Sequence, residues 1–384
     1  MRRSSGARCA RRRWARIPAT SRPWRTPSPW RPLLAPSEYE GTPTRGYLDS
    51  ATFGLPPRST LAAMEEALAG WRSGRRWRDW EEDGEACRSL FAGLVGAQAE
   101  DVALVGATSV ATGLVAASLP AGPGANVVLY ERDFTSALLP FRCLESRGVE
   151  LRLVPLERLA EAVDERTALV SVSLVQSAEG RVADLEALRA TGAPILLDAT
   201  QAVGAYPVDL AGVDYLVAHG YKWLLCPRGL TFFYLSPGRR LQIEPWTAGW
   251  KSRVDPYEDY YGLPELTPDA RRLDISLPWF SAAGGRASLQ LFADLGIERV
   301  AAHNSRLARA LTEELGLPEP PTPIVRIQVD DAEGAAARLQ EAGIACSVRG
   351  GSVRLSFHLY NDETDVELAA TALRPSFRSL GVNG

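Results

Sequence analysis

Short apolar runs alternate with helix-like segments through the middle of this chain, from about residue 100 to residue 237. The helix-like segments repeat apolar residues at helical spacing. The runs between them are largely apolar and have the length of roughly four to eight residues that is common for strands. These runs are DVALVG, ANVVLYE, ELRLVPL, TALVSVSLV, PILLDA, DYLVAHG and GLTFFYLSP. Because parallel strands are buried on both faces, they read as continuous apolar runs, and the pattern therefore predicts an α/β domain.

The composition divides the chain into three parts. Residues 1–45 are rich in arginine, serine and proline and lack periodicity, which is typical of a disordered tail. Residues 46–245 hold the alternating pattern and predict a large domain, in which Ser59 is placed to cap the first helix. Residues 246–384 combine a loop rich in tryptophan, tyrosine and proline, a long helix over 287–315 and a smaller α+β unit.

The formal net charge of −3 conceals an uneven distribution. Residues 1–37 contain ten arginines and no acid, so 33 basic residues stand against 46 acidic ones in the remainder, a balance of −13 (33 − 46). This balance argues against nucleic acid as the main partner, although contact between the basic tail and nucleic acid is a lesser alternative. No apolar run approaches the roughly 18 residues of a membrane span.

The cysteines and histidines give no spacing typical of a metal site. The five cysteines are scattered without a CxxC motif, and the chain contains three histidines. We therefore expect no metal centre, and a reducing cytoplasm is the simplest location.

Chemically distinctive residues follow three of the predicted strands, at the edge where open α/β sheets bind ligands. The turn at Gly106, Ala107 and Thr108 opens a helix, and its free amides form a natural phosphate cradle, although an ordinary helix start has the same sequence. Asp198 closes a strongly apolar strand, where a carboxylate needs a donor or a cation. It either caps the next helix or pairs with a protonated ring nitrogen. Lys222 follows the next strand on the same edge.

Lysine is rare in this chain: Lys222 and Lys251 are the only two among 43 basic residues. A primary amine condenses with an aldehyde to form a Schiff base, whereas a guanidinium does not, which gives a reason to keep lysine at position 222. A phosphate cradle, a carboxylate and a lysine are the parts that hold pyridoxal 5'-phosphate. We therefore predict this cofactor, with an amino acid or amine as substrate. Motifs GxGxxG and GxxxxGK[ST] are absent, which argues against nucleotide binding.

Four segments carry a resemblance to the class V aminotransferase family, whose members are pyridoxal-phosphate enzymes of fold type I and include cysteine desulfurases, kynureninases and isopenicillin-N-epimerase-like proteins. The segments are YLDSAT, LLDATQAVG, HGYKWLLCPRG and VRLSFHLYND, and the similarity spans about residues 46–372. It implies an aspartate-aminotransferase-like fold, in which a large cofactor domain with a mainly parallel seven-stranded sheet precedes a smaller C-terminal α+β domain. It also implies a homodimer.

By position, the resemblance implies that Lys222 carries the cofactor as a Schiff base and acts as the base at the substrate Cα, while Asp198 pairs with the pyridinium nitrogen. Arg354 matches the family's arginine for the substrate carboxylate, a bidentate task, with a surface salt bridge as its alternative. Gln176 is expected on the substrate side. The other implied cofactor contacts are Gln201 at the phenolic oxygen, Phe134 stacked on the ring unless it is plain core, Ala107, Thr108, His219 and Tyr221 around the phosphate, and Thr247 and Trp250 reaching the neighbouring subunit's phosphate.

The reaction remains open at this point. The leading interpretation is a class V aminotransferase. The alternatives are a β-lyase that cleaves a C–S or C–C bond, as in kynureninase-like members, an epimerase, and more remotely a cofactor-binding protein without catalysis. A desulfurase needs a nucleophilic cysteine on a mobile loop. Cys346 instead lies within an apparent strand, just before a short turn, so we expect it to be a small buried apolar residue.

Overall fold

The computed structural model describes residues 36–39, 44–258 and 260–378, all of which belong to the unit Pro32–Gly384. Most of the predicted tail therefore lies outside the described residues. Its residues Pro36–Tyr39 form the 3-10 helix η1, and Tyr39 is buried. None of the helices in the described ranges is both long and apolar enough to span a bilayer.

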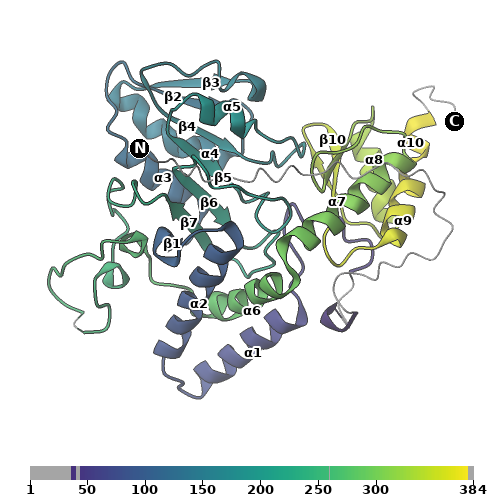
Figure 1. The fold of residues 1–384 in the computed structure, drawn as a ribbon. Helices are drawn as coiled ribbons and strands as arrows, with labels where there is room; N and C mark the ends of the chain where they lie inside the picture. The colour runs from purple at the N-terminus through teal and green to yellow at the C-terminus, as the bar shows by residue number, and fades with distance from the viewer. Residues whose placement is uncertain (1–35, 40–43, 259, 379–384) are drawn as a thin grey trace, which may run out of the picture. The chain divides into compact units, whose positions relative to one another are not determined.

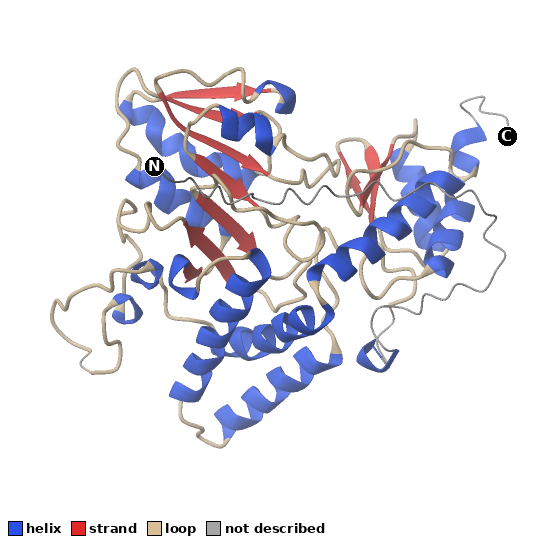
Figure 2. Ribbon diagram, viewed as in Figure 1, coloured by secondary structure: helices blue, strands red, loops and turns tan. Residues whose placement is uncertain are grey.

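A seven-stranded, mainly parallel sheet forms the large part of the fold (Figure 2). Six strands run in one direction, and β7 is antiparallel to both of its neighbours. Each of the seven apolar runs contains one of these strands, so the predicted fold class is confirmed. In the order in which they lie across the sheet, the strands are β1 (Val102–Val105), β7 (Thr231–Leu235), β6 (Tyr215–His219), β5 (Ile195–Asp198), β4 (Thr167–Ser173), β2 (Asn126–Tyr130) and β3 (Glu150–Val154).

Apolar cores lie on both faces of this sheet, because successive side chains of a strand point to opposite faces. In β7, Phe232 belongs to one core and Phe233 to the other. Phe232 stacks on Phe91 of α2 with ring centroids 4.2 Å apart. The helices that accompany the sheet are α1 (Arg58–Arg72), α2 (Arg78–Val95), α3 (Thr108–Ser118), α4 (Thr135–Leu138), α5 (Leu185–Ala190) and α6 (Trp279–Leu295), with 3-10 helices at Ala99–Asp101, Leu139–Arg147, Leu156–Arg158, Trp250–Ser252 and Ala270–Leu273.

Two local predictions about the helices are wrong. The single helix expected over 287–315 is two helices, because Gly296 adopts a φ of +79° between α6 and α7 (Ile297–Glu314). A positive φ is incompatible with a continuing right-handed helix. Ser59 does not cap α1, since the helix already begins at Arg58 and the buried Ser59 hydroxyl has no hydrogen-bond partner. Helix α2 was not predicted.

A second, antiparallel sheet of three strands forms the smaller C-terminal unit (Figure 1). It packs against α8 and α9 around its own apolar core. A segment near residue 48 pairs with this sheet, since Asp49 bridges to Ser356, and this pairing brings Asp49 beside the middle strand. In sheet order the strands are β8 (Ile324–Ile327), β10 (Ser352–Ser356) and β9 (Ser347–Arg349). The helices of this unit are α8 (Ala332–Glu341), α9 (Glu363–Leu373) and α10 (Pro375–Arg378).

Candidate active site

The carboxyl ends of β1, β4, β5 and β6 border a cavity of about 190 Å³ at one edge of the large sheet. This is the edge at which the sequence predicts a ligand. The structure brings eight of the predicted residues together around the cavity: Lys222, Asp198, Gln201, Phe134, Ala107, Thr108, His219 and Tyr221.

Lys222 extends from the turn after β6 and is buried, with 6% of its surface exposed. Its Nζ atom lies 5.5 Å from the ring centroid of Phe134, and no acidic group in the described part of the chain lies within ion-pair distance of it. Burial lowers the pKa of Lys222 to about 8; Asp198 opposes this shift and nearby arginines add to it. A substantial fraction of the amine is therefore neutral and nucleophilic near pH 8.

Close backbone packing fixes the turn that carries Lys222. The amide of Gly54 donates to the carbonyl of Tyr221 over 3.0 Å. A Cβ atom at Gly54 would lie 2.2 Å from the carbonyl oxygen of Lys222, so glycine is required at this contact. Leu225, whose φ of +57° places it in the left-handed region, donates its amide to the Lys222 carbonyl. The lysine is therefore held by a constrained loop rather than a free one.

Asp198 is the last residue of β5 and its carboxylate faces the cavity. Its Oδ1 atom accepts from the backbone amide of Thr200 over 2.8 Å. Burial raises the pKa of Asp198, and hydrogen bonds from Thr200 oppose this shift. Among the described residues, none supplies a cation within ion-pair distance of this carboxylate. A buried carboxylate of this kind is suited to accept a hydrogen bond from a protonated nitrogen of a ligand.

Gln201 lines the cavity, but its amide group is committed within the protein. Its Nε2 atom donates to the carbonyl of Ala51 over 2.9 Å and to Ser177 over 3.0 Å. Its Oε1 atom accepts from the indole of Trp223 over 2.7 Å. These bonds fix the orientation of the amide at the edge of the cavity.

The start of α3 forms one end of the cavity. Ala107 precedes the helix in an extended conformation without a side-chain cap, and the buried Thr108 begins it. The first amides of a helix have no partner within the helix and favour an anion. The Nδ1 atom of His219 nearby is buried and has no hydrogen-bond partner among the described residues, and burial lowers the pKa of His219 to about 4. The guanidinium of Arg228 lies 4.5 Å from the ring centroid of Tyr221.

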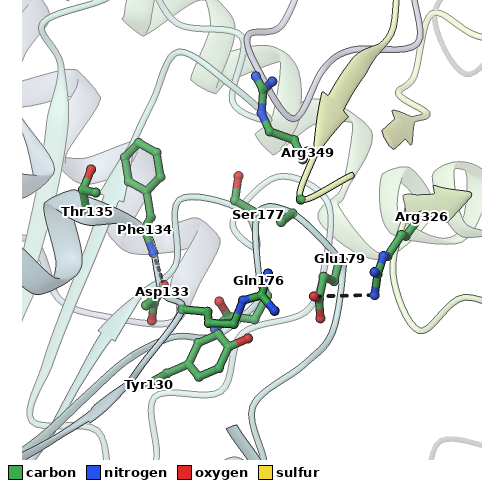
Figure 3. A pocket seen from close by; sticks show the side chains of 12 residues that line it. Tyr130, Asp133, Phe134, Thr135, Gln176, Ser177, Glu179, Arg326 and Arg349 are labelled. Atoms are coloured by element: carbon green, nitrogen blue, oxygen red, sulfur yellow. Dashed lines mark hydrogen bonds and ion pairs between the residues drawn. The ribbon is translucent and has the colours of Figure 1, made fainter. Parts of the chain in front are cut away.

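Phe134 is 50% exposed, so it is not a core side chain. Its backbone amide donates to Asp133 Oδ1 over 2.7 Å (Figure 3). Asp133 also accepts from the amide and the hydroxyl of Ser173. This buried carboxylate ties the end of β4 to the loop that presents the Phe134 ring. The ring is therefore exposed toward the cavity and held by its backbone.

Gln176 lines a second cavity of about 280 Å³ that shares Phe134 and Ser177 with the first. Gln176 is buried and donates from Nε2 to the carbonyl of Ser173 over 2.8 Å. Its expected role on the substrate side remains a prediction.

Arg354 lies outside the residues that line these two cavities and is buried on β10. Its Nη2 atom donates to Asp49 over 3.0 Å and to Thr52, and its Nη1 atom donates to the carbonyl of Ser177 over 2.8 Å. Its Nε atom is buried without a partner. The expected role of Arg354 toward a substrate carboxylate remains a prediction.

Thr247 and Trp250 are not brought to the cavity within this chain. Thr247 donates to the carbonyl of Leu273 over 3.3 Å. Trp250 packs edge-on against Trp77, with ring centroids 5.5 Å apart. Their expected contact with a neighbouring subunit remains a prediction.

The other lysine, Lys251, lies outside this site and is held in an ion pair. Lys251 Nζ lies 2.7 Å from Glu81 Oε2, and both side chains are buried. Burial lowers the pKa of Lys251, but the Glu81 carboxylate outweighs burial and leaves the pKa raised.

Five residues that line the first cavity are not predicted from the sequence: Ser136, Ser173, Ser177, Thr200 and Arg228. For two of them, the sequence contains a feature that points to the site. Thr200 stands between Asp198 and Gln201 in the quoted motif, and Arg228 is the one cation besides Lys222 in HGYKWLLCPRG. The three serines had none, because small hydroxyl residues are common at strand ends.

Comparison with known proteins identifies the family. The model for aminotransferase class-V matches residues 46–368. The chain belongs to the aminotransferase class-V family. Members of this family depend on pyridoxal phosphate, and the resemblance stated from the motifs is confirmed.

Individual members resemble the chain over most of its length. A probable cysteine desulfurase of Methanothermobacter thermautotrophicus is 27% identical over 85% of this chain and 93% of its own length. Isopenicillin N epimerase of Streptomyces clavuligerus is 28% identical over 74% of this chain and 82% of its own. A solved complex of the cystine C–S lyase C-DES with its product cysteine persulfide has a TM-score of 0.80 at 19% identity, covering 87% of this chain and 98% of that one. This last similarity shows a shared fold.

Proposed function

We propose that this class V chain is an enzyme that binds pyridoxal phosphate at Lys222 and transforms an amino acid by removing its Cα proton. The observation that carries the proposal is the pair Lys222 and Asp198. One is a buried amine with a pKa lowered to about 8, the other is a buried carboxylate to which none of the described residues supplies a cation, and both line one cavity.

The residues of the cavity fit this cofactor in charge and in hydrogen bonding. Asp198 would pair with the pyridinium nitrogen, which supplies the cation that the carboxylate lacks. The start of α3, the unpaired Nδ1 atom of His219 and the exposed guanidinium of Arg228 would hold the phosphate. Phe134 would cover the ring. When bound, pyridoxal phosphate supplies an aldehyde for an amine and a ring that takes up the electron pair left at the substrate Cα.

The protein's own contribution is one base in a partly enclosed cavity. Once its Nζ atom is released, Lys222 accepts the Cα proton of the substrate, for which its lowered pKa is suited. Phe134 lies across from the amine and carries no proton, and the lowered pKa of His219 keeps that ring neutral at ordinary pH. Lys222 is therefore the proton carrier that the lining residues best support.

A single base is sufficient for transamination. Lys222 can return the proton it has taken to another atom on the same side, and no second base is needed. Epimerisation by two opposed bases is disfavoured, because Phe134, the ring beside the amine, cannot carry a proton. The aminotransferase interpretation is therefore our first candidate.

A β-lyase is the second candidate, favoured by relatives such as the probable cysteine desulfurase. Elimination of a good leaving group also needs only one base at Cα. A persulfide-forming desulfurase fits less well. Burial raises the pKa of Cys346 to about 11, and among the described cysteines none lines either cavity.

We also propose that the chain forms the expected homodimer. The segment 241–263 exposes large apolar side chains, including those of Leu241, Trp246 and Leu263, which a partner subunit would cover. Light scattering should then give twice the mass of one chain. A monomer at micromolar concentration would contradict this.

The central test uses the fact that the chain has two lysines. Borohydride reduction followed by peptide mapping should place the pyridoxyl group on the peptide of Lys222. Lys222→Arg should lose this adduct and the visible absorbance of the cofactor, whereas Lys251→Arg, which can keep the ion pair with Glu81, should retain both. An adduct on Lys251, or none on the wild type, would refute the proposal.

Product analysis of the loaded enzyme then separates the reactions. Consumption of a keto-acid acceptor indicates transamination, and release of pyruvate or alanine without an acceptor indicates a lyase. Retained cofactor with no product across an amino-acid panel would indicate a binding protein without catalysis.

A further inference from the structure

The second cavity, of about 280 Å³, extends from Phe134 toward the small sheet (Figure 3). It shares Phe134 and Ser177 with the cavity that contains Lys222. This space is therefore open to the side chain of a substrate whose α-amino group reaches Lys222. The residues that line the space decide which side chain is accepted.

Three arginines line this cavity: Arg132 after β2, Arg326 on β8 and Arg349 at the end of β9. All three are exposed. Arg132 and Arg349 form no ion pair with any acid in the described parts of the chain. Arg349 donates to the backbone carbonyl of Val348 over 2.9 Å, which leaves most of its donors available.

Arg132 reaches across the cavity from the large sheet to the β9–β10 turn. Its Nη2 atom lies 3.7 Å from where a Cβ atom of Gly350 would stand, and Gly350 has a φ of +54°. The turn therefore leaves room for a guanidinium beside it. Arg349 precedes Gly350 in the same turn, so the two arginines line the cavity from the large sheet and from the small sheet.

Two carboxylates line the same cavity, and among the described residues neither pairs with Arg132 or Arg349. Asp133 is buried and accepts hydrogen bonds from Ser173 and from the amide of Phe134. Glu179 is shared between Arg181 at 3.5 Å and Arg326 at 3.6 Å. The cavity thus has an excess of positive charge beside the reactive amine. The charge of Arg349 also contributes to the lowered pKa of Lys222, which shows that it is felt at the amine.

We propose that this cavity binds a second acidic group, so that the substrate is an amino acid whose side chain carries a carboxylate or a similar anion. The proposal rests on the proposed function, because it takes Lys222 as the point where the amino group is held. Arg132 and Arg349 provide forked donors for the side-chain anion, and Arg326 completes the positive wall. An amide of the same shape offers no charge to these arginines and is disfavoured.

The test compares isosteric pairs on the cofactor-loaded protein: L-glutamate with L-glutamine and L-aspartate with L-asparagine. Dissociation constants come from titration calorimetry and from the change in the cofactor's visible absorbance, at low salt. At least one acid should bind about tenfold or more tightly than its amide, since hydrogen bonds to charged groups are worth this much. The preference should shrink as salt is added.

Variants Arg132→Gln and Arg349→Gln should each reduce this preference severalfold and leave the affinity for the amide unchanged. Arg142→Gln is the matched control, because Arg142 is exposed on the same domain, pairs with Glu145 and lies outside the cavity. It should leave the preference intact.

Two results would overturn the proposal. Equal affinities for acid and amide in both pairs would show that the cavity does not distinguish a charged substrate side chain from a neutral one. Equal weakening of acid and amide in the variants would show that the arginines bind the α-carboxylate common to all amino acids. Both results leave the borohydride adduct on Lys222 intact, so they are distinguishable from failure of the proposed function. If the cofactor is not retained, calorimetry of the same pairs on the cofactor-free protein decides the charge preference.

Discussion

The guanidinium of Arg354 donates from Nη2 to Oδ1 of Asp49 across 3.0 Å, and the two residues are 305 positions apart in the chain. Asp49 also accepts at Oδ2 from the hydroxyl of Ser347. Since Asp49 belongs to the segment that pairs with β10, this ion pair ties that segment more firmly to the small sheet. It also fixes the one arginine that the family motif assigns to a substrate carboxylate.

Replacing Asp49 should therefore destabilise the fold. Asp49→Asn keeps the shape and leaves the buried guanidinium without a counter-charge, which typically costs about 3 kcal/mol in the free energy of unfolding. Urea denaturation measures this loss. Glu145→Gln removes one acid from an exposed pair with Arg142 and should cost less than about 1 kcal/mol. Losses of equal size in the two variants would contradict a buried, stabilising pair.

The reactivity of Lys222 should change with pH around its lowered pKa of about 8. The amine is nucleophilic only when neutral, so labelling of the cofactor-free protein by a small acylating reagent should rise about tenfold per pH unit below pH 8 and level off above it. Peptide mass spectrometry follows both lysines in one experiment. Lys251, with a raised pKa, should begin to react only at higher pH. A common midpoint for the two lysines would refute the perturbed site.

Removing the ring of Phe134 should weaken cofactor retention. In the proposed complex the ring covers the cofactor, and an aromatic contact contributes about 0.5–1.5 kcal/mol beyond its buried area. Phe134→Ala should therefore raise the cofactor's dissociation constant by about threefold to tenfold or more, measured by dialysis against limiting pyridoxal phosphate. Leu139→Ala, an exposed apolar residue on the next helix, should leave the constant unchanged. An unchanged constant in Phe134→Ala would place the cofactor elsewhere.

Gly54→Ala should disturb the lysine turn. The added Cβ atom would stand 2.2 Å from the carbonyl oxygen of Lys222, and a backbone atom cannot move away cheaply. We expect a loss of about 3 kcal/mol in stability and a lower rate of cofactor capture. Gly93→Ala, on α2 with open space around it, should instead gain up to about 1 kcal/mol. Tolerance of alanine at position 54 would show that the turn can relax.

The sequence located the parts of the site that sit on strand ends. Asp198, Lys222 and the turn at Thr108 follow apolar runs, and the carboxyl ends of neighbouring parallel strands meet at one edge. No such rule exists for contacts between distant segments. The pairing of Arg354 with Asp49 depends on how the two sheets are joined, and the hydrogen bonds that occupy Gln201 depend on Trp223 and Ala51 packing around it.

The length of the helix expected over residues 287–315 was overestimated for a related reason. Residues 287–315 keep helical periodicity across Gly296, so the pattern alone gives no break. The break depends on a positive φ that glycine allows but does not require. Similarly, the arginines of the second cavity lie after β2, on β8 and on β9, and only the fold reveals that they line one cavity.

The confinement of lysine to two positions has a consequence for chemical ageing of the protein. Reducing sugars modify proteins chiefly at neutral side-chain amines. In this chain the amine of Lys251 is held in its charged form by Glu81. The amine of Lys222 would already be bound to the aldehyde of the cofactor. Slow glycation of side chains should therefore have little to attack in this chain as long as its cofactor stays in place.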